Sequence, residues 1–521
     1  MSKVCTFEEA ASQIESGSTV SILGVIGWIT PEKLYKSIRE RFDNEGAPNN
    51  LTLFVPCYSG DNGDIKGTDN FMAEGMTTRI ISGSYINPPD PKTGERPATM
   101  GLIKSNKIEA YSFHIGAMMH WTRDIARRGP GYMTKIGLDT FVDPLQGGGK
   151  LTPCTTKDIV ERVNFKGEDY LYFPPMNLDV ALIRASKSDI YGNLSFENDP
   201  LVSSALTLAM AVKACGGKVI VQVNEIVEPG ERYAQMVKIP GNFVDHIVVD
   251  DNPLMVTGTQ FDPAFMGKDR INVLDAPKLP LDAQKVIARR AAQMVRKDEL
   301  AIFGFGASSN VPSILAEDGA LDGDKIYSYP STTEHGSYGG MVTKGWQFSA
   351  NLNPDALIDG VTQFDAIHGG ACKSAFLAFA QFDQEGNVNV SRFANANPGS
   401  GGFIDIAYNA ERVIFTGTFT TAGNKVDVID GKLNITKEGK FTKFVQKAEE
   451  VTYPVRKHVK ERNQEAWLIT ERAVFQVRNE DLLLVEIAPG IDLNLDILEQ
   501  MQYPITVAED LKVMDSSLFT E

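Results

Sequence analysis

The chain lacks the features that mark several classes of protein. It has only five cysteines in 521 residues, and no two of them form a CxxC pair: Cys5, Cys57, Cys154, Cys215 and Cys372. This spacing excludes the usual zinc, thiol-redox and haem motifs and favours a reducing compartment. The longest apolar run, around Ala205 to Val212, is too short to span a membrane, and the first residues contain no apolar signal core. We therefore expect a cytoplasmic protein with no membrane partner.

Positive charge is also scarce. The sequence has 51 Lys and Arg against 67 Asp and Glu, which gives a formal net charge of -16. Nucleic-acid binding requires clustered cations, so we expect no nucleic-acid partner. A single anionic ligand is not excluded, because a few cations and backbone amides can hold one whatever the total charge.

The common nucleotide, hydrolase and metal motifs are missing as well. The stretch from Gly147 to Lys150 lacks the Gly and the Ser or Thr that a P-loop requires, and no G-x-S-x-G elbow surrounds Ser337 or Ser400. The six histidines include no H-E-x-x-H. We expect no metal ion and no permanently bound cofactor.

What is present is the pattern of a large α/β protein. Its length predicts two to four domains. Thr6 and Glu9 form a capping box for a short helix, and the apolar stretch 19–25 predicts a strand covered on both faces. Thr30 and Pro31 then supply an N-cap and a first-turn residue for the next helix. Together they make a β-loop-α unit.

An internal repeat extends this reading to the whole chain. The segment beginning at Asp189 recurs at Asp383, and the strand beginning at Val219 recurs at Val413, so that 383 − 189 and 413 − 219 are both 194. The first β-loop-α unit recurs at a longer offset, around Gly304 and Gly306. The repeat predicts two similar open α/β domains with mostly parallel sheets, produced by duplication. We place them at residues 1–275 and 276–521, with the seam in the loop-rich stretch 251–280.

One acidic residue stands where an α/β sheet binds ligands. Glu334 ends an apolar strand segment and is followed by a turn containing Gly336, Gly339 and Gly340. By spacing alone, a solvated loop glutamate is the better interpretation, because a Glu before a glycine turn is usually a solvated loop residue.

The order Glu334-x-Gly336-x-x-Gly339-Gly340 resembles the single-chain family I coenzyme A (CoA) transferases of the acetate or propionate type, in which alpha and beta halves are fused. The resemblance is collinear over nearly the whole chain, through Thr140-Phe-Val-Asp143-Pro144, Gln363-Phe-Asp365, Gly401-Gly402-Phe-Ile-Asp405, Glu471-Arg472 and Pro489-Gly490. It implies the CoA-transferase fold, which is similar to that of NagB and RpiA.

The resemblance also implies an activity: reversible, ping-pong transfer of CoA between an acyl-CoA and a small carboxylic acid through a glutamyl-CoA thioester. CoA would be substrate and covalent intermediate, and the enzyme a homo-oligomer. The implied site has Glu334 as nucleophile, backbone donors at Gly401 and Gly402, CoA-binding residues Gly304, Gly306, Gly369, Gly370 and Phe403, and an acyl pocket with Trp28, His114, Ile115 and Lys373.

Two departures from the family pattern concern the acyl pocket. Ile115 stands where relatives carry a glutamine whose amide serves as a second oxyanion donor, and an isoleucine side chain cannot donate. Either His114 or a backbone amide would replace it. Lys373 stands where relatives tend to carry Asp. We expect a specificity shifted from simple acetate and propionate; the alternative for Lys373 is a surface residue pointing away.

Two other functions stay open at this stage: an acyl-CoA hydrolase on the same scaffold, and a non-catalytic CoA-thioester-binding protein, made conceivable by the missing glutamine. The presence of Glu334 in its glycine turn favours an enzyme.

Overall fold

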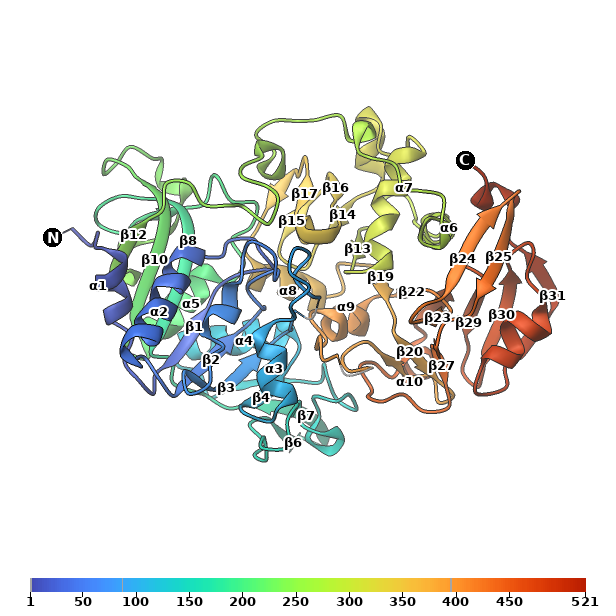
Figure 1. Cartoon of the computed structure of the whole chain (residues 1–521), viewed down its shortest axis with the longest axis horizontal. Helices are drawn as coiled ribbons and strands as arrows, with labels where there is room; N and C mark the ends of the chain where they lie inside the picture. Colours follow the sequence, from blue (N-terminus) through green and yellow to red (C-terminus); the bar gives the residue numbers. More distant parts are fainter. Residues whose placement is uncertain (1, 87, 394–395) are drawn as a thin grey trace.

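The computed structural model describes residues 2–86, 88–393 and 396–521 (Figure 1). Two sheets dominate the molecule. The first, blue to green in Figure 1, lies toward the N-terminus, and the second, yellow to red, extends toward the C-terminus, with helices α8 and α9 between them. No helix in the described ranges is long and apolar enough to cross a membrane.

The first sheet has a parallel order β12-β10-β8-β1-β2-β3-β4. In addition, β9 pairs antiparallel with β8, and β11 pairs antiparallel with β9. Its strands are β1 (Thr19–Ile22), β2 (Leu51–Val55), β3 (Thr77–Ser82), β4 (Glu109–Ser112), β8 (Val180–Ser188), β9 (Leu194–Ser195), β10 (Lys218–Ile226), β11 (Val237–Ile239) and β12 (His246–Val249).

Helices cover both faces of this sheet, which explains why its strands show no polar alternation. Leu182 and Ile220 pack with the first two helices on one face, whereas Ala181 and Val219 pack on the other. The helices of this half are α1 (Phe7–Ser12), α2 (Glu32–Glu45), α3 (Ala98–Lys104), α4 (Ile115–Ala126) and α5 (Ala205–Ala214).

The second sheet has the order β18-β15-β14-β13-β19-β22-β28-β29-β30-β31, and β14 to β28 run parallel. Its strands are β13 (Ala301–Phe303), β14 (Ser331–Thr332), β15 (Ser337–Tyr338), β18 (Ala356–Leu357), β19 (Ser374–Ala378), β22 (Arg412–Thr416), β28 (Glu465–Ile469), β29 (Ala473–Val477), β30 (Leu482–Ile487) and β31 (Thr506–Val513). The helices are α6 (Ala283–Ala292), α7 (Val311–Glu317), α8 (Gly360–His368), α9 (Phe403–Asn409) and α10 (Val455–Arg462).

Short antiparallel sheets complete the described chain. They are formed by β5 (Tyr132–Thr134), β6 (Glu161–Phe165) and β7 (Glu168–Phe173); β16 (Met341–Val342) and β17 (Asn351–Leu352); β20 (Gln381–Asp383), β21 (Val388–Asn389) and β27 (Phe444–Val445), where β27 joins parallel; β23 (Thr420–Thr421) and β26 (Phe441–Thr442); and β24 (Lys425–Ile429) and β25 (Lys432–Lys437).

The two sheets repeat one another in register, so the predicted pair of similar α/β domains is confirmed. Val219 pairs with Ala181 in the first sheet and Val413 pairs with Ala375 in the second, and 413 − 219 and 375 − 181 are both 194. The repeated Asp-x-x-Gly-Asn turns also match. The Asn193 amide hydrogen-bonds the Asp189 carboxylate at 2.7 Å, and the second copy repeats this bond at 3.2 Å.

The largest hydrophobic cluster contains residues of both sheets, including Ile183 and Phe415, so the halves share one core. The last strand of the first sheet ends at Val249 and β13 begins at Ala301, so the expected boundary at 275/276 falls in the connecting segment. That boundary stays a prediction.

Local expectations near the N-terminus were met in one case and wrong in another. The Thr6–Glu9 capping box is present. Thr30, in contrast, does not cap the next helix: its hydroxyl is buried 2.9 Å from that of Ser59, and Pro31 occupies the N-cap position. The Thr30 side chain therefore takes part in a tertiary contact and not in the helix cap that the local sequence predicted.

Candidate active site between the two sheets

Glu334 follows β14 at the carboxyl edge of the second sheet. The backbone on its N-terminal side is fixed twice: the Thr333 hydroxyl donates to the carbonyl of Ser349 at 2.9 Å, and the Gln363 amide donates to the carbonyl of Thr333 at 2.8 Å. The nucleophile predicted from sequence is thus held by a rigid edge of the sheet.

The glycine after Glu334 is required by the turn. Gly336 has φ +92°, and a Cβ there would lie 2.3 Å from the carbonyl oxygen of Ile358. The chain reverses at this point, so that Tyr338 of β15 pairs antiparallel with Thr332 of β14. A side chain at position 336 would move this turn and the Glu334 carboxylate with it.

The Glu334 side chain is only 16% exposed. Burial and, second to it, the nearby negative charge of Asp405 raise the pKa of this carboxyl to about 7, against the lowering effect of a backbone hydrogen bond from Gly402. His335 lies beside it, with Nε2 3.7 Å from Oε1, and burial lowers the pKa of that imidazole to about 3. Near neutral pH the site therefore holds a carboxyl poised between its two forms.

The predicted Gly401–Gly402 turn lies against this carboxyl group. A Cβ on Gly402 would lie 2.2 Å from Oε2 of Glu334, so only glycine fits. Gly402 is also the N-cap residue of α9, and the carbonyl of Gly401 accepts a hydrogen bond from the amide of Ile115 at 3.0 Å. The turn therefore joins the first half of the chain to Glu334, and its role as oxyanion donor stays a prediction.

His114 and Ile115 lie at the start of α4 on the other side of this turn. The Ile115 side chain is buried, with Cγ1 2.8 Å from where a Cβ of Gly83 would lie. His114 does not present a free ring nitrogen to Glu334 by any observed contact: its Nδ1 lies 2.6 Å from Asp405, and its Nε2 faces Gly137. The His114 imidazole therefore interacts with Asp405 and not with Glu334.

Trp28 connects the first half to the strand that carries Glu334. Its indole Nε1 donates to the carbonyl of Phe348 at 2.9 Å, next to Ser349, which accepts from Thr333. The ring is fully buried and meets Phe265 edge to face at 5.0 Å. Trp28, which the resemblance places in the acyl pocket, thus contacts the segment 348–349 that also holds the backbone before Glu334.

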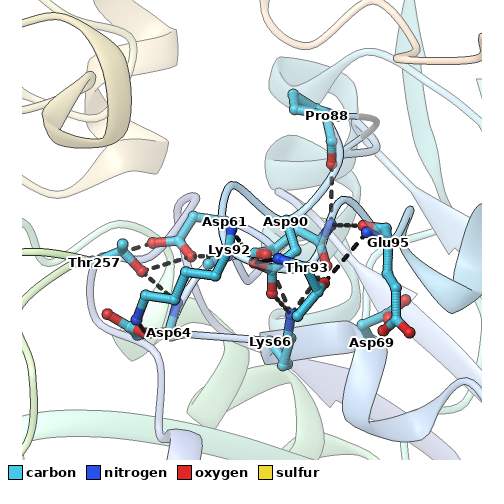
Figure 2. A network of polar contacts seen from close by, with 12 residues as sticks. Asp61, Asp64, Lys66, Asp69, Pro88, Asp90, Lys92, Thr93, Glu95 and Thr257 are labelled. Carbon is cyan, nitrogen blue, oxygen red and sulfur yellow. Dashed lines mark hydrogen bonds and ion pairs between the residues drawn. The ribbon is translucent and has the colours of Figure 1, made fainter.

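A polar network lies beside the residue that precedes Trp28, and Figure 2 shows its members. Asp61 lies against Gly27: a Cβ on Gly27 would be only 2.6 Å from Oδ2 of Asp61. The other carboxylate oxygen, Oδ1, accepts a hydrogen bond from the Thr257 hydroxyl at 2.9 Å. Nearby, Lys66 pairs with Asp90 at 2.6 Å and lowers the pKa of that carboxyl to about 2. These bonds tie the segments around residues 61–66, 90–95 and 257 together beside the Trp28 turn.

Two of the predicted CoA-binding glycines lie at the same edge of the sheet as Glu334. Gly304 and Gly306 follow β13, which is adjacent to β14. Between them Phe305 is 56% exposed and meets Phe348 edge to face at 5.4 Å. Phe403, in contrast, is buried and stacks on Phe415 at 5.9 Å, so its ring belongs to the core.

Three predicted site residues lie at the opposite edge. Gly369 and Gly370 end α8, and Lys373 immediately precedes β19, whose first residue pairs with the first residue of β13. The Lys373 ammonium forms an ion pair with Glu411 at the surface. Ala301 pairs with both Ser331 and Ser374, so Glu334 stands three positions beyond the level at which β19 begins. This geometry favours the surface alternative for Lys373, and its place in the acyl pocket stays a prediction. The CoA-binding roles of Gly369 and Gly370 stay predictions.

The structure adds residues that sequence reasoning missed. Asp405 is fully buried and is approached by Nδ1 of His114 at 2.6 Å, by Nε2 of His368 at 2.7 Å, and by the amide of Gly116 at 2.9 Å. Asp405 stands three residues after Gly402, and this spacing was the one available signal. His114 is 291 positions away, so no local pattern could have predicted the contact.

Comparison with known proteins adds the decisive observation. Caffeate CoA-transferase of Acetobacterium woodii is 39% identical over all of this chain and 98% of its own length. The chain belongs to the coenzyme A transferase family. A family model described as coenzyme A transferase matches residues 4–250. The acetate CoA-transferase YdiF of Escherichia coli K12 is 35% identical over 99% of the chain and 95% of the relative.

The fold of the transferase is likewise matched by solved structures. The YdiF apoenzyme of Escherichia coli O157:H7 superposes with a TM-score of 0.91 at 34% identity, covering 100% of this chain and 96% of that one. A second structure of that protein, with the same score, is described as a thioester complex with CoA. The transferase therefore acts on acyl-CoA and carboxylic acids, and neither a hydrolase nor a non-catalytic binder is favoured.

Proposed function

We propose that the transferase works by a ping-pong mechanism through a CoA thioester on Glu334. The observation that carries the proposal is the placement of this carboxyl: it is buried at the carboxyl edge of the sheet, within contact distance of the Gly402 backbone, with its pKa raised to about 7. The CoA thioester described for YdiF supports the same route.

In the first half-reaction the ionised Glu334 attacks the thioester carbonyl of the acyl-CoA. The tetrahedral oxyanion collapses, the C–S bond breaks, and a mixed anhydride and CoA thiolate form. The thiolate then attacks the glutamyl carbonyl of the anhydride. This step releases the first acid as its carboxylate and leaves the glutamyl-CoA thioester.

The second half-reaction reverses these steps with another acid. Its carboxylate attacks the glutamyl thioester carbonyl and expels CoA thiolate, and the thiolate attacks the acyl carbonyl of the new anhydride. A new acyl-CoA leaves and Glu334 returns as a carboxylate. The amide of Gly402 is positioned to stabilise the oxyanions formed on the Glu334 carbonyl.

We also infer which acids the transferase accepts. The relatives named above act on caffeate and on acetate according to their names, so the candidate acids range from short aliphatic to aromatic. Ile115 and Trp28 are apolar at positions next to the Gly401 turn and the Glu334 strand. We infer a pocket that accepts acids larger than acetate, formed without Lys373.

The test is intact-mass measurement of wild type and Glu334→Ala after incubation with acetyl-, propionyl- and caffeoyl-CoA and no acceptor. We expect a CoA-sized adduct on wild type alone, and hydroxylamine should remove it. Glu480→Ala, which removes an exposed surface glutamate, is the matched control and should form the adduct normally.

The outcomes separate the three functions. CoA release without acceptor acid, together with no lasting adduct, would indicate a hydrolase. Ligand binding with neither adduct nor turnover from any donor would contradict the glutamyl mechanism. Assembly into a homo-oligomer stays a prediction and is measured separately by light scattering.

A further inference from the structure

Asp405 is a buried carboxylate that the proposed chemistry does not use. It lies on the first turn of α9, three residues after Gly402, and its side chain is fully buried. Burial would raise the pKa of this carboxyl, but His114 and His368 together hold it well below its ordinary value. Asp405 is therefore charged near neutral pH.

Residues of two helices, α4 and α8, form the cage around this charge. His114 comes from the start of α4, Gly116 from its first turn, and His368 from the end of α8. A Cβ on Gly116 would lie 2.3 Å from Oδ1 of Asp405 and 2.7 Å from Nε2 of His368, so the cage closes only around glycine. Such close packing fixes the carboxylate in one place.

Among the titratable groups around Glu334 and Asp405, Asp405 is the one that supplies a fixed negative charge beside Glu334. Around Glu334 the titratable neighbours are Cys57, whose thiol pKa is raised by burial, and the neutral His335. Behind Asp405, beyond the two cage histidines, lie His120, Tyr132, Arg123 and Asp365. Burial lowers the pKa of His120 to about 4, so that ring is neutral. Arg123 and Asp365 form an ion pair.

We propose that Asp405 is a positioning residue that holds a fixed negative charge behind Glu334, so that Glu334 favours the uncharged acylated state over the free carboxylate. The proposal rests on the glutamyl-thioester mechanism. Two like charges in a site of low polarity repel one another, and forming the thioester removes one of them. The charge acts through Glu334 and touches no substrate atom.

The same repulsion makes Glu334 a stronger nucleophile once it is ionised, because nucleophilic strength rises with basicity. His368 moderates the effect, since its hydrogen bond to Asp405 partly neutralises the charge. Removing Asp405 and removing His368 must therefore change Glu334 in opposite directions. A purely structural role for Asp405 would predict no such opposition.

The experiment compares Asp405→Asn, His368→Phe and the control Asp365→Asn, all as full-length protein. In Asp405→Asn the acid limb of kcat/KM should move down by about one pH unit, and at pH 8.5 the ratio of glutamyl-CoA thioester to free enzyme, at fixed acyl-CoA and acid, should fall about tenfold. In His368→Phe the acid limb should move up. Asp365→Asn, which removes a half-exposed carboxylate of α8, should leave both unchanged.

Failure of this inference is distinguishable from failure of the mechanism. If wild type forms no adduct, the glutamyl mechanism fails. If wild type and Asp405→Asn both form the adduct with the same acid limb and the same thioester ratio, only the role of Asp405 is overturned. If Asp405→Asn does not fold, His368→Phe decides: an unmoved or lowered acid limb contradicts the proposal.

Discussion

Gly402 faces the Glu334 carboxylate so closely that a Cβ would lie 2.2 Å from Oε2. Gly401, one residue earlier, has open space around its Cβ position and φ +56°. The two glycines of one turn therefore have different reasons for being glycine: close approach in one case and backbone conformation in the other.

Gly402→Ala should lower kcat by about 100-fold or more, because the new methyl group displaces either the oxyanion donor or the carboxylate. Gly401→Ala is the matched control: it carries a backbone strain of about 1 kcal/mol and leaves the carboxylate untouched, so its kcat should fall far less. Steady-state kinetics of both variants measure the difference. Equal losses would contradict the assignment of Gly402.

The pH profile of wild type should show an acid limb in kcat/KM near pH 7. Below that pH Glu334 is protonated and cannot attack, so kcat/KM should fall about tenfold for each further pH unit. Initial rates between pH 5 and 9 with acetyl-CoA and a fixed acceptor test this. An acid limb near pH 4.5 would mean that the carboxyl is not desolvated in the working enzyme.

Glu334→Gln should stabilise the fold at alkaline pH. The folded-state pKa of Glu334 is raised above its unfolded value, so the folded state binds more protons between about pH 4.5 and 7, and the wild type loses stability as pH rises through that window. At pH 8 the amide should raise the free energy of unfolding by about 1–3 kcal/mol. The unfolding midpoints of wild type and Glu334→Gln should differ at pH 8 and should be nearly equal at pH 4.5.

Trp28→Phe should destabilise the enzyme by about 1–3 kcal/mol, because the buried carbonyl of Phe348 loses its donor. Trp467→Phe is a matched control, since that indole donates to Glu465 in a half-buried position on β28. The unfolding midpoint should fall clearly more for Trp28→Phe. Equal shifts would show that the contact between halves contributes no more than a peripheral one.

Lys373→Asp should leave the order of preferred acids unchanged. Lys373 lies at the amino edge of the second sheet beside Glu411, away from Glu334. Two facing carboxylates cost at most about 1 kcal/mol at an exposed position. A screen of acetyl-, propionyl- and caffeoyl-CoA against both proteins checks this, and an altered order would place Lys373 in the acyl pocket.

The sequence alone determined the features that depend on neighbours along the chain or on repetition. The apolar strands without alternation, the Thr6–Glu9 capping box and the 194-residue repeat predicted two α/β units. These follow from local backbone preferences and from burial of both sheet faces, which are written into short stretches of sequence.

Only the tertiary structure decided which residues meet at Glu334. Lys373 and Gly370 lie near Glu334 in sequence but at the opposite ends of the strands, since parallel strands send consecutive loops to opposite edges. His114 and Asp405, 291 positions apart, meet in the shared core of the two halves. Closeness in sequence therefore does not specify which edge of the sheet a loop reaches, and contacts across the interface depend on how the two sheets pack.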